Sequence, residues 1–300
     1  MKTSTKTWIA GVTAVVVLGA GGIYYMNQQQ SAQVTSQETN QISKMSNTEK
    51  AVALLKSFET GDTGIAKQVL KKDYIQHNQT VATGLDGFLQ IMEGAKNGGS
   101  AATVDIKRQF EDGNTVVLHS VYNFGGQEMV GFDVFKFDDA GMITEHWDNL
   151  SPVRDANYSG HTQFDGAATI DTSVNGEETK KLVSTYIDDI IYGQHPEKLD
   201  SYFNGDNYIQ HNADMVDTVS GFKASLQQMA QMGINMDYKT THQVLAQGDF
   251  ALVISEGNLA GKETAFYDLY RVENGKIAEH WDVLADVIAD SEAANTNGKF

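Results

Sequence analysis

The sequence contains no cysteine, only two prolines, and far fewer basic than acidic residues. Without cysteine there can be no disulfide, no thiolate ligand for zinc, no cysteine nucleophile and no lipidated lipoprotein N-terminus. The 22 Lys and Arg residues against 39 Asp and Glu residues give a formal net charge of −17. Because phosphate binding requires clustered Lys and Arg, and no such cluster occurs, the composition excludes nucleic acid as an expected partner.

Hydrophobic residues make up 41% of the 300 positions, as is typical of a globular protein, and the length suits two domains of ordinary size. An uncharged, apolar stretch runs from Trp8 to Tyr25, after Lys2 and Lys6, and no basic residue follows until position 44. The positive charge is therefore expected to stay in the cytoplasm. We predict that residues 1–26 are a signal peptide or membrane anchor and that the remainder is exported to the cell envelope, anchored or secreted after cleavage.

Two short motifs occur twice. Tyr-Ile-Gln-His-Asn stands at 74–78 and 208–212, and Glu-His-Trp-Asp stands at 145–148 and 279–282. The common offset of 134 residues (208 − 74 and 279 − 145) shows that both copies have nearly the same internal length. The residues between the motifs have diverged while the motifs are identical, so a physical requirement holds these side chains in place.

The repeat defines a domain organisation. After a polar tether at 27–47, we predict a first domain at 48–155 and a second at 177–290. A Gly-, Ser-, Thr- and Asp-rich linker at 156–176 joins them, and residues 291–300 form a polar tail.

Both copies show the same order of elements. In the first copy a capping-box pattern at Ser46–Glu49 opens a helix that ends at Gly61, and in the second a comparable helix ends at Gly193. A short second helix and a third helix follow, and both copies finish with alternating or β-branched runs typical of strands. The first copy's predicted strands are 104–110, 115–122, 130–137 and 142–150. This order predicts an α+β fold, with three helices packed on a curved antiparallel sheet.

Alternation along the strands suggests a polar site in each copy. His146 and Asp148 point to one face, while Glu145 and Trp147 point to the other. Asp133 shares a face with large apolar side chains. Such a carboxylate is either a pocket acid or base with a raised pKa, or a structural group that orients an imidazole or caps backbone donors. The surroundings favour a pocket for Asp133, His146 and Asp148, and equally for Asp268, His280 and Asp282.

Other residues in or near the motifs are interpreted differently. His77 and His211 are left open between a hydrogen-bonded core histidine and a pocket acid or base. Trp147 and Trp281 are interpreted as core residues. Gly87 and Gly221 are interpreted as serving the backbone near a helix start. No closely spaced histidine pair, phosphate loop or dinucleotide fingerprint is present, so we expect no metal and no cofactor.

Each copy resembles the SnoaL-like group of the nuclear transport factor 2-like superfamily. The residues that carry the resemblance are Tyr74–Asn78, Asp133, Gly141, Ile143 and Glu145–Asp148, then Tyr208–Asn212, Asp268, Gly275, Ile277 and Glu279–Asp282. The resemblance implies two tandem cone-shaped α+β barrels, each with a mostly apolar pocket at its open end. It also implies that the two copies pack through their sheets as an intramolecular pseudo-dimer.

The best-known enzymes of this group are polyketide cyclases, which close a ring by intramolecular aldol condensation without a cofactor. Carried over by position, Asp148 and Asp282 are the implied acid/base residues. Their implied hydrogen-bonding partners are His77, Asp133 and His146 in the first copy, and His211, Asp268 and His280 in the second.

Two functional hypotheses follow. One is a cofactor-independent lyase, isomerase or cyclase that acts on a small carbonyl compound. The other is a non-catalytic, envelope-tethered module that binds a small apolar ligand or a protein. Under both hypotheses the only expected contact with a membrane is through the N-terminal segment.

Overall fold

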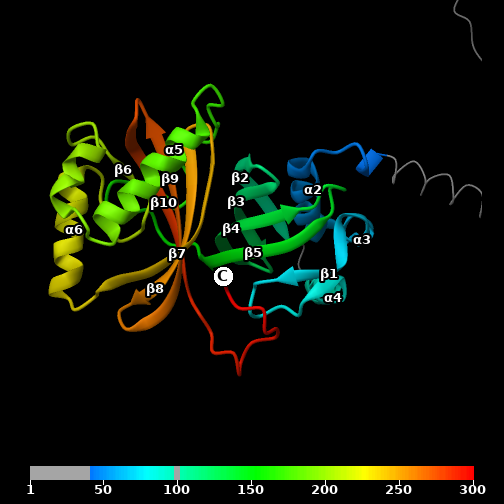
Figure 1. Ribbon diagram of the computed structural model, residues 1–300. Coiled ribbons are helices and arrows are strands. Elements are labelled where there is room, and N and C mark those ends of the chain that lie inside the picture. The colour runs from blue at the N-terminus through cyan, green and yellow to red at the C-terminus, as the bar shows by residue number, and fades with distance from the viewer. Residues whose placement is uncertain (1–40, 98–101) are drawn as a thin grey trace, which may run out of the picture. The chain divides into compact units, whose positions relative to one another are not determined.

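The computed structural model describes residues 41–97 and 102–300, and the chain divides into two units, Met1–Lys44 and Met45–Phe300. The predicted signal peptide or anchor at 1–26, and most of the tether, lie outside the described residues. Within the described ranges, no helix combines the length and apolar character needed to cross a membrane. The unit Met45–Phe300 contains two five-stranded sheets with their helices, and each copy of the repeat forms one sheet (Figure 1).

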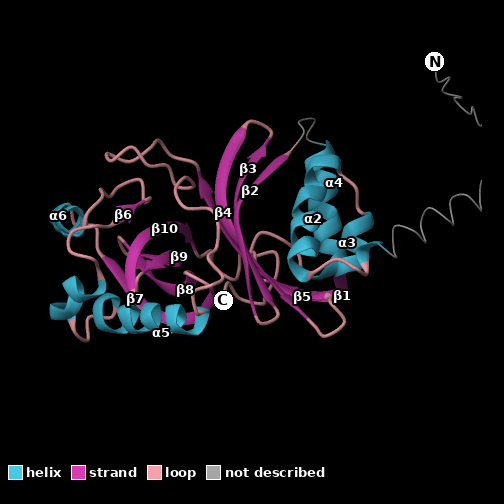
Figure 2. Cartoon of the chain, turned by 90° about the horizontal axis from the view of Figure 1, so that it is seen from above, coloured by secondary structure: helices cyan, strands magenta, loops and turns pink. Residues whose placement is uncertain are grey.

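The first domain has three helices and five strands. Its elements are α2 (Asn47–Thr60), α3 (Gly64–Val69), β1 (Leu70–Gln76), α4 (Gly84–Asn97), β2 (Thr103–Asp112), β3 (Thr115–Phe124), β4 (Gln127–Phe137) and β5 (Ile143–Pro152). The strand order is β1-β5-β4-β3-β2. Strand β1 pairs in parallel with β5, and all other neighbours are antiparallel. The helices α2, α3 and α4 lie together beside this sheet (Figure 2).

The second domain repeats this arrangement with shorter or altered helices. Its elements are α5 (Gly176–Tyr186), the π-helix η1 (Ile187–Ile191), the 3-10 helix η2 (Pro196–Tyr202), β6 (Ile209–Gln210), α6 (Val219–Gln231), β7 (Met236–Gln247), β8 (Phe250–Leu259), β9 (Lys262–Glu273) and β10 (Lys276–Asp286). The strand order, β6-β10-β9-β8-β7, matches that of the first sheet. The tandem α+β fold predicted from the repeat is confirmed.

Local sequence explains where the first helix begins and ends. The Ser46 hydroxyl accepts a hydrogen bond from the Glu49 backbone N–H (3.2 Å), and the Glu49 carboxylate accepts one from the Ser46 N–H (2.7 Å). This reciprocal pair is the predicted capping box. Gly61 ends the helix in the left-handed region, at a φ of 68°, where glycine carries no steric penalty.

One feature of the sheets corrects the sequence expectation. They are mixed rather than purely antiparallel, because part of the first motif forms an edge strand parallel to the strand that carries the second motif. Parallel pairing requires a long crossover connection, and the chain between β1 and β5 provides it.

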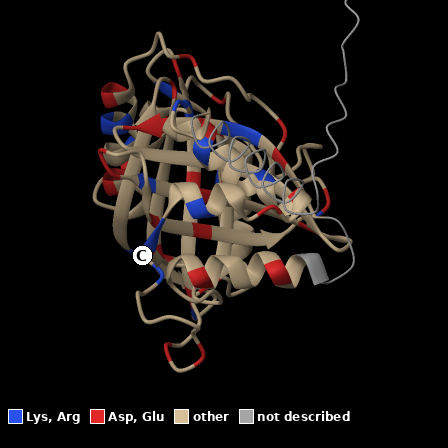
Figure 3. Ribbon diagram, turned by 90° about the vertical axis from the view of Figure 1, so that its right-hand side faces the viewer, with Lys and Arg blue, Asp and Glu red and all other residues tan. Residues whose placement is uncertain are grey.

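In the view of Figure 3, Lys and Arg positions are scattered among Asp and Glu positions, in keeping with the absence of a basic cluster in the sequence.

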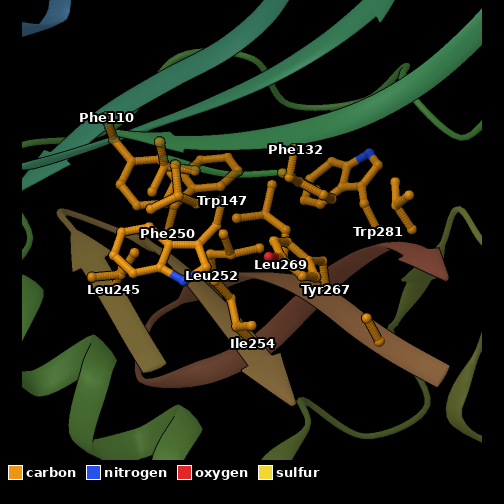
Figure 4. Packing of buried hydrophobic residues seen from close by; sticks show 14 of the residues in the cluster. Phe110, Phe132, Trp147, Leu245, Phe250, Leu252, Ile254, Tyr267, Leu269 and Trp281 are labelled. Carbon is orange, nitrogen blue, oxygen red and sulfur yellow. The ribbon is translucent and has the colours of Figure 1, made fainter. Parts of the chain in front are cut away.

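A shared apolar core joins the two sheets (Figure 4). Phe132 and Trp147 enter it from the first domain, and Phe250, Tyr267 and Trp281 enter it from the second. All five side chains are buried, so the interpretation of both tryptophans as core residues is confirmed. Because Trp147 faces this core, strand alternation turns its neighbours His146 and Asp148 to the other side of the sheet.

The segment that follows the last strand of each sheet crosses to the opposite domain. We call residues 153–167 the first arm and residues 287–300 the second arm. Both contain the pattern Ala-Asn-x-x-Gly, beginning at Ala156 and Ala294. The Asn157 amide donates to the Gln210 carbonyl oxygen (2.6 Å), and the Asn295 amide donates to the Asn78 and Val81 carbonyl oxygens (2.8 Å each). Each arm therefore docks beside the first motif of the other copy.

Candidate functional site

The paired strands bring two carboxylates together in each domain. Asp133 on β4 lies opposite Asp148 on β5, and Asp268 on β9 lies opposite Asp282 on β10. His146 and His280 stand two residues before Asp148 and Asp282, so each histidine shares the face of the carboxylate that follows it. The structure thus brings together the predicted Asp-His-Asp groups, one in each domain.

Each Asp-His-Asp group lines a cavity enclosed partly by helices. The first cavity has a volume of about 260 Å³ and the second about 200 Å³. Apolar side chains dominate both linings: Leu55, Phe58 and Phe88 in the first, and Ile190, Leu226 and Met236 in the second. The polar groups therefore converge on a mostly apolar space, which is the usual character of a small-molecule site.

Hydrogen bonds fix the first group. His146 Nε2 lies 3.1 Å from Asp133 Oδ1, and the Tyr122 hydroxyl donates to the other oxygen of Asp133. The Asn78 amide donates to Asp148 Oδ2 at 2.8 Å. The remaining oxygen of Asp148 and the Nδ1 atom of His146 are buried without a hydrogen-bond partner among the described residues, although the Lys299 ammonium lies 3.9 Å from that Asp148 oxygen. These two atoms are available to a bound ligand.

The second group repeats this network with one addition. His280 Nε2 lies 3.1 Å from Asp268 Oδ1, the Tyr238 hydroxyl donates to Asp268 at 3.2 Å, and the Asn212 amide donates to Asp282 Oδ2 at 2.7 Å. In addition, His280 Nδ1 lies 2.9 Å from the side-chain oxygen of Gln210.

The contact with Gln210 determines where protons lie. The Gln210 oxygen also accepts the backbone N–H groups of His211 and Asn212 (3.0 Å each), so it faces His280 Nδ1 as an acceptor. A proton on Nδ1 follows. The other ring nitrogen of His280 lies 3.1 Å from a carboxylate oxygen of Asp268, so acceptors hold the ring from both sides.

Burial changes the acidity of these groups. It raises the pKa of Asp133 above its usual value, although the hydrogen bond from His146 opposes the rise. Burial likewise raises the pKa of Asp282 from 3.8 to about 6, with His280 opposing and Asp268 adding to the rise. It also raises the pKa of Tyr122 and Tyr238 well above the usual range, which keeps both phenols protonated as donors. Asp282 is thus poised for proton transfer near neutral pH.

His77 and His211 lie outside both cavities, which corrects their expected hydrogen bonds to the pocket carboxylates. His77 stacks on Trp147, with ring centroids 4.7 Å apart, and its Nε2 lies 3.0 Å from Glu145 Oε1. His211 stacks on Trp281 in the same way, at 4.6 Å. Both histidines come directly after the edge strands and lie on the face that meets the opposite domain. The next residues, Asn78 and Asn212, donate to Asp148 and Asp282, where the histidines had been expected.

The sequence reasoning missed four contributors to the site. It assigned no role to Asn78 and Asn212, although both belong to the repeated motif. It also missed Tyr122 and Tyr238, which approach equivalent carboxylates from different strands, β3 and β7. A repeat comparison cannot align two tyrosines that come from non-equivalent strands.

Metal-binding potential is present at three places among the described residues. Three ligand atoms lie within 4.8 Å of one another in each of the two pocket groups and in a third group of His161, Asp165 and His211. A metal in either pocket would have to break the hydrogen bond between Asp133 and His146, or between Asp268 and His280. The third group lies outside the cavities.

Residues 51–146 match the family model of the SnoaL-like domain. The matched range runs from α2 to His146 of the second motif and covers about a third of the chain. The first domain is therefore a SnoaL-like domain, and the second domain has the same strand order. The fold is that of the nuclear transport factor 2-like superfamily, as the motif resemblance implied.

Solved structures align with one domain at a time. IdmH from Streptomyces antibioticus, described as a candidate polyketide cyclase, is 18% identical over 36% of this chain and 93% of its own, with a TM-score of 0.32. TsrD from Streptomyces laurentii is 17% identical over 34% of this chain and 88% of its own, with a TM-score of 0.30. An NTF2-like protein of unknown function from Cytophaga hutchinsonii is 17% identical over 36% and 92%, with a TM-score of 0.31. No curated protein matches the sequence.

Proposed function

We propose that the second cavity is the active site of a cofactor-independent enzyme that moves a proton next to a carbonyl group, with Asp282 as the acid/base residue. The observation that carries this proposal is the environment of Asp282. Its carboxyl group is buried in an apolar cavity, its pKa is raised to about 6, and among the described residues only Asn212 donates a hydrogen bond to it. A base of this kind is ionised at neutral pH yet still strong enough to accept a proton from carbon.

The volume of the cavity limits the substrate. A cavity of about 150 Å³ holds benzene, so by proportion about 200 Å³ accommodates roughly eight non-hydrogen atoms. This matches a single-ring or short-chain carbonyl compound. A four-ring steroid or polyketide exceeds it.

Tyrosines around the second cavity supply donors for the oxygen of an enolate. The Tyr208 oxygen accepts a hydrogen bond from Gln210 at 3.2 Å, which leaves its own O–H to donate. The hydroxyls of Tyr186 and Tyr270 also belong to residues that line this cavity, and neither has an acceptor within the described part of the chain. O–H groups directed at a developing oxyanion stabilise it.

These roles combine into a short reaction. Asp282 takes the proton from the carbon next to the carbonyl, and a tyrosine O–H donates to the enolate oxygen. The proton on Asp282 then returns to a different carbon, which gives an isomer. Alternatively, the enolate carbon bonds to a second carbonyl carbon, and the proton goes to the new alkoxide, which gives a ring.

The first cavity favours a second candidate function, non-catalytic binding of an apolar ligand. Tyr122, the one tyrosine among the described residues that line it, already donates to Asp133, and the lining residue Phe124 is 39% exposed. With about 260 Å³ it accommodates roughly ten non-hydrogen atoms.

We further propose that the protein works in the cell envelope. Fractionation of cells and N-terminal sequencing of the mature chain would test this proposal.

The catalytic proposal is tested by proton exchange. Ketones and enones of about eight non-hydrogen atoms are incubated with the full chain in D₂O, and exchange next to the carbonyl is followed by NMR. We expect exchange that Asp282→Asn reduces at least 100-fold, the usual scale of general-base catalysis. Asp286→Asn, an exposed carboxylate on the same strand, is the matched control. Exchange that persists in Asp282→Asn contradicts the proposal.

A further inference from the structure

A separate cluster of histidines and carboxylates lies where the first arm docks on the second domain. The arm supplies His161, Thr162 and Asp165, and the second domain supplies His211. His211 Nδ1 lies 2.7 Å from Asp165 Oδ1 and 2.9 Å from the Thr162 carbonyl oxygen. His161 Nδ1 lies 3.6 Å from Asp165 Oδ2. Two ring nitrogens thus lie beside the Asp165 carboxylate, and one of them also lies beside the Thr162 carbonyl oxygen.

The spacing of these atoms suits one small cation. Ligands of a tetrahedral zinc ion lie about 3.3 Å from one another, given bonds of about 2.0 Å. The three side-chain ligand atoms here lie within 4.8 Å of one another, and the two His–Asp distances, 2.7 Å and 3.6 Å, lie on either side of the ideal value.

Carboxylates hold the far side of both histidine rings. His211 Nε2 lies 2.9 Å from Glu279 Oε1, and His161 Nε2 lies 3.2 Å from Asp217 Oδ2. A neutral imidazole has one N–H. His211 Nδ1 faces the Thr162 carbonyl oxygen, an acceptor, so an ion bound there would take the place of a proton on that nitrogen. A metal-ligating histidine is usually oriented in this way, with its second nitrogen donating to a carboxylate.

The arm that carries these ligands is held firmly. The guanidinium group of Arg108, from the first domain, donates to the carbonyl oxygens of Phe164 (3.2 Å), Asp165 and Ala167 (2.6 Å). Gly166 allows the close approach, because a Cβ atom there would lie 2.1 Å from Glu279 Oε1 and 2.8 Å from the His211 ring. The position of Asp165 is thus fixed by its neighbours on both sides of the domain boundary.

We propose that His161, Asp165 and His211 bind one Zn²⁺ ion, with the Thr162 carbonyl oxygen completing the set. Two imidazoles and a carboxylate are ligands that zinc accepts. The ion would fasten the first arm to the second domain. This inference is independent of the function proposed for the cavities.

The described residues of the first domain form no equivalent site. There His77 Nδ1 lies 2.9 Å from the Gly298 carbonyl oxygen, and Lys299 follows at the place in the second arm that corresponds to His161 in the first. The Lys299 ammonium donates to the Asp148 carbonyl oxygen at 2.6 Å. A lysine occupies the place where the other copy has a ligand, so we expect one ion per chain.

The test uses the full chain without a histidine tag, freed of metal by a chelator and titrated with Zn²⁺ by calorimetry and with Co²⁺ by visible absorption. We expect one equivalent of each metal to bind and Co²⁺ to give the intense visible bands of a tetrahedral site. His161→Ala and Asp165→Asn should each weaken binding at least 100-fold. Asp217→Asn, which removes only the carboxylate behind His161, should weaken it 10- to 100-fold.

Two controls make the result decisive. The double variant Asp148→Asn/Asp282→Asn removes a carboxylate from each pocket group and should bind zinc as wild type does. His195→Ala removes a histidine outside the cluster and should also leave binding unchanged. The proposal is overturned if no metal binds, or if binding survives in His161→Ala and Asp165→Asn. The proposal is also overturned if only the pocket double variant loses zinc binding. Circular dichroism of each metal-free variant checks that the variant is folded.

Discussion

The side-chain amide of Asn149 donates to the carbonyl oxygen of Val283 at 2.7 Å, and Val283 is the residue at the position of Asn149 in the second copy. A residue meets its own counterpart only near the two-fold axis of an isologous pair. The same amide donates to the Ala265 carbonyl oxygen at 3.0 Å. A local two-fold axis therefore passes beside Asn149, through the apolar core that joins the sheets.

This geometry predicts a specific rescue. Asn149→Val removes both donors from buried carbonyl groups and should lower the free energy of unfolding by about 2 kcal/mol. Adding Val283→Asn places an amide at the symmetry-related position, so the double variant should recover at least half of the loss. Urea unfolding of the full chain measures both. A double variant less stable than Asn149→Val contradicts the local symmetry.

The reciprocal arms predict that a substitution in one arm loosens the opposite domain. Asn295→Ala removes hydrogen bonds to Asn78 and Val81, and Asn157→Ala removes the one to Gln210. Each should cost about 1–2 kcal/mol. Hydrogen exchange should rise around residues 76–83 in Asn295→Ala and around residues 209–212 in Asn157→Ala. If protection from exchange were lost only in the domain that precedes each arm in sequence, the docking of each arm on the opposite domain would be contradicted.

The equivalent glycines Gly87 and Gly221 should respond differently to alanine. A Cβ atom on Gly87 would lie 2.0 Å from the Ala82 carbonyl oxygen, which is backbone. On Gly221 it would meet mainly the Val216 side chain at 2.7 Å, which can move. We expect Gly87→Ala to lower the free energy of unfolding by about 2–3 kcal/mol. Gly221→Ala should change it by less than about 1 kcal/mol, because helix propensity offsets the contact. Equal effects in urea unfolding would argue against this explanation.

Much of the fold followed from local patterns in the sequence. The capping box at Ser46, the alternating strands and the identical motif offset predicted the order of elements, and they placed Asp148 and Asp282 beside His146 and His280. Strand alternation has a fixed period, so a face assignment on one strand is reliable.

The features that the sequence did not reveal depend on contacts between distant segments. His77 and Asn78 are neighbours in a segment where either could have faced the pocket, and the contacts of His77 with Trp147 and with the docked arm show that His77 faces away. The Ala-Asn-x-x-Gly pattern recurs at an offset of 138 residues (294 − 156). Aligning the two copies at the motif offset of 134 residues therefore does not superpose it. The residues interpreted as linker and tail therefore gave no sign of their roles as arms.

The raised pKa of Asp282 predicts a pH-dependent cost to stability. The folded protein holds this proton more tightly than the unfolded chain does, so stability from Asp282 is full below pH 3.8 and is lost as the pH rises through about 6. The loss amounts to about 3 kcal/mol. Asp282→Asn, which stays neutral, should be more stable than wild type by up to this amount at pH 8 and nearly equal to it at pH 4. Unfolding free energies at both pH values measure this difference, and Asp286→Asn should show no comparable trend.

Under the proposed function, Asp282 takes a proton from a carbon acid in the second cavity. Its most direct test is the pH dependence of the exchange rate next to the carbonyl of an active compound, measured by NMR for wild type and Asp282→Asn. We expect the wild-type rate to rise with pH and to level off above a midpoint near 6, and we expect Asp282→Asn to lose this midpoint and to lower the plateau rate at least 100-fold. A rate without this midpoint, or one that Asp282→Asn leaves unchanged, would contradict it.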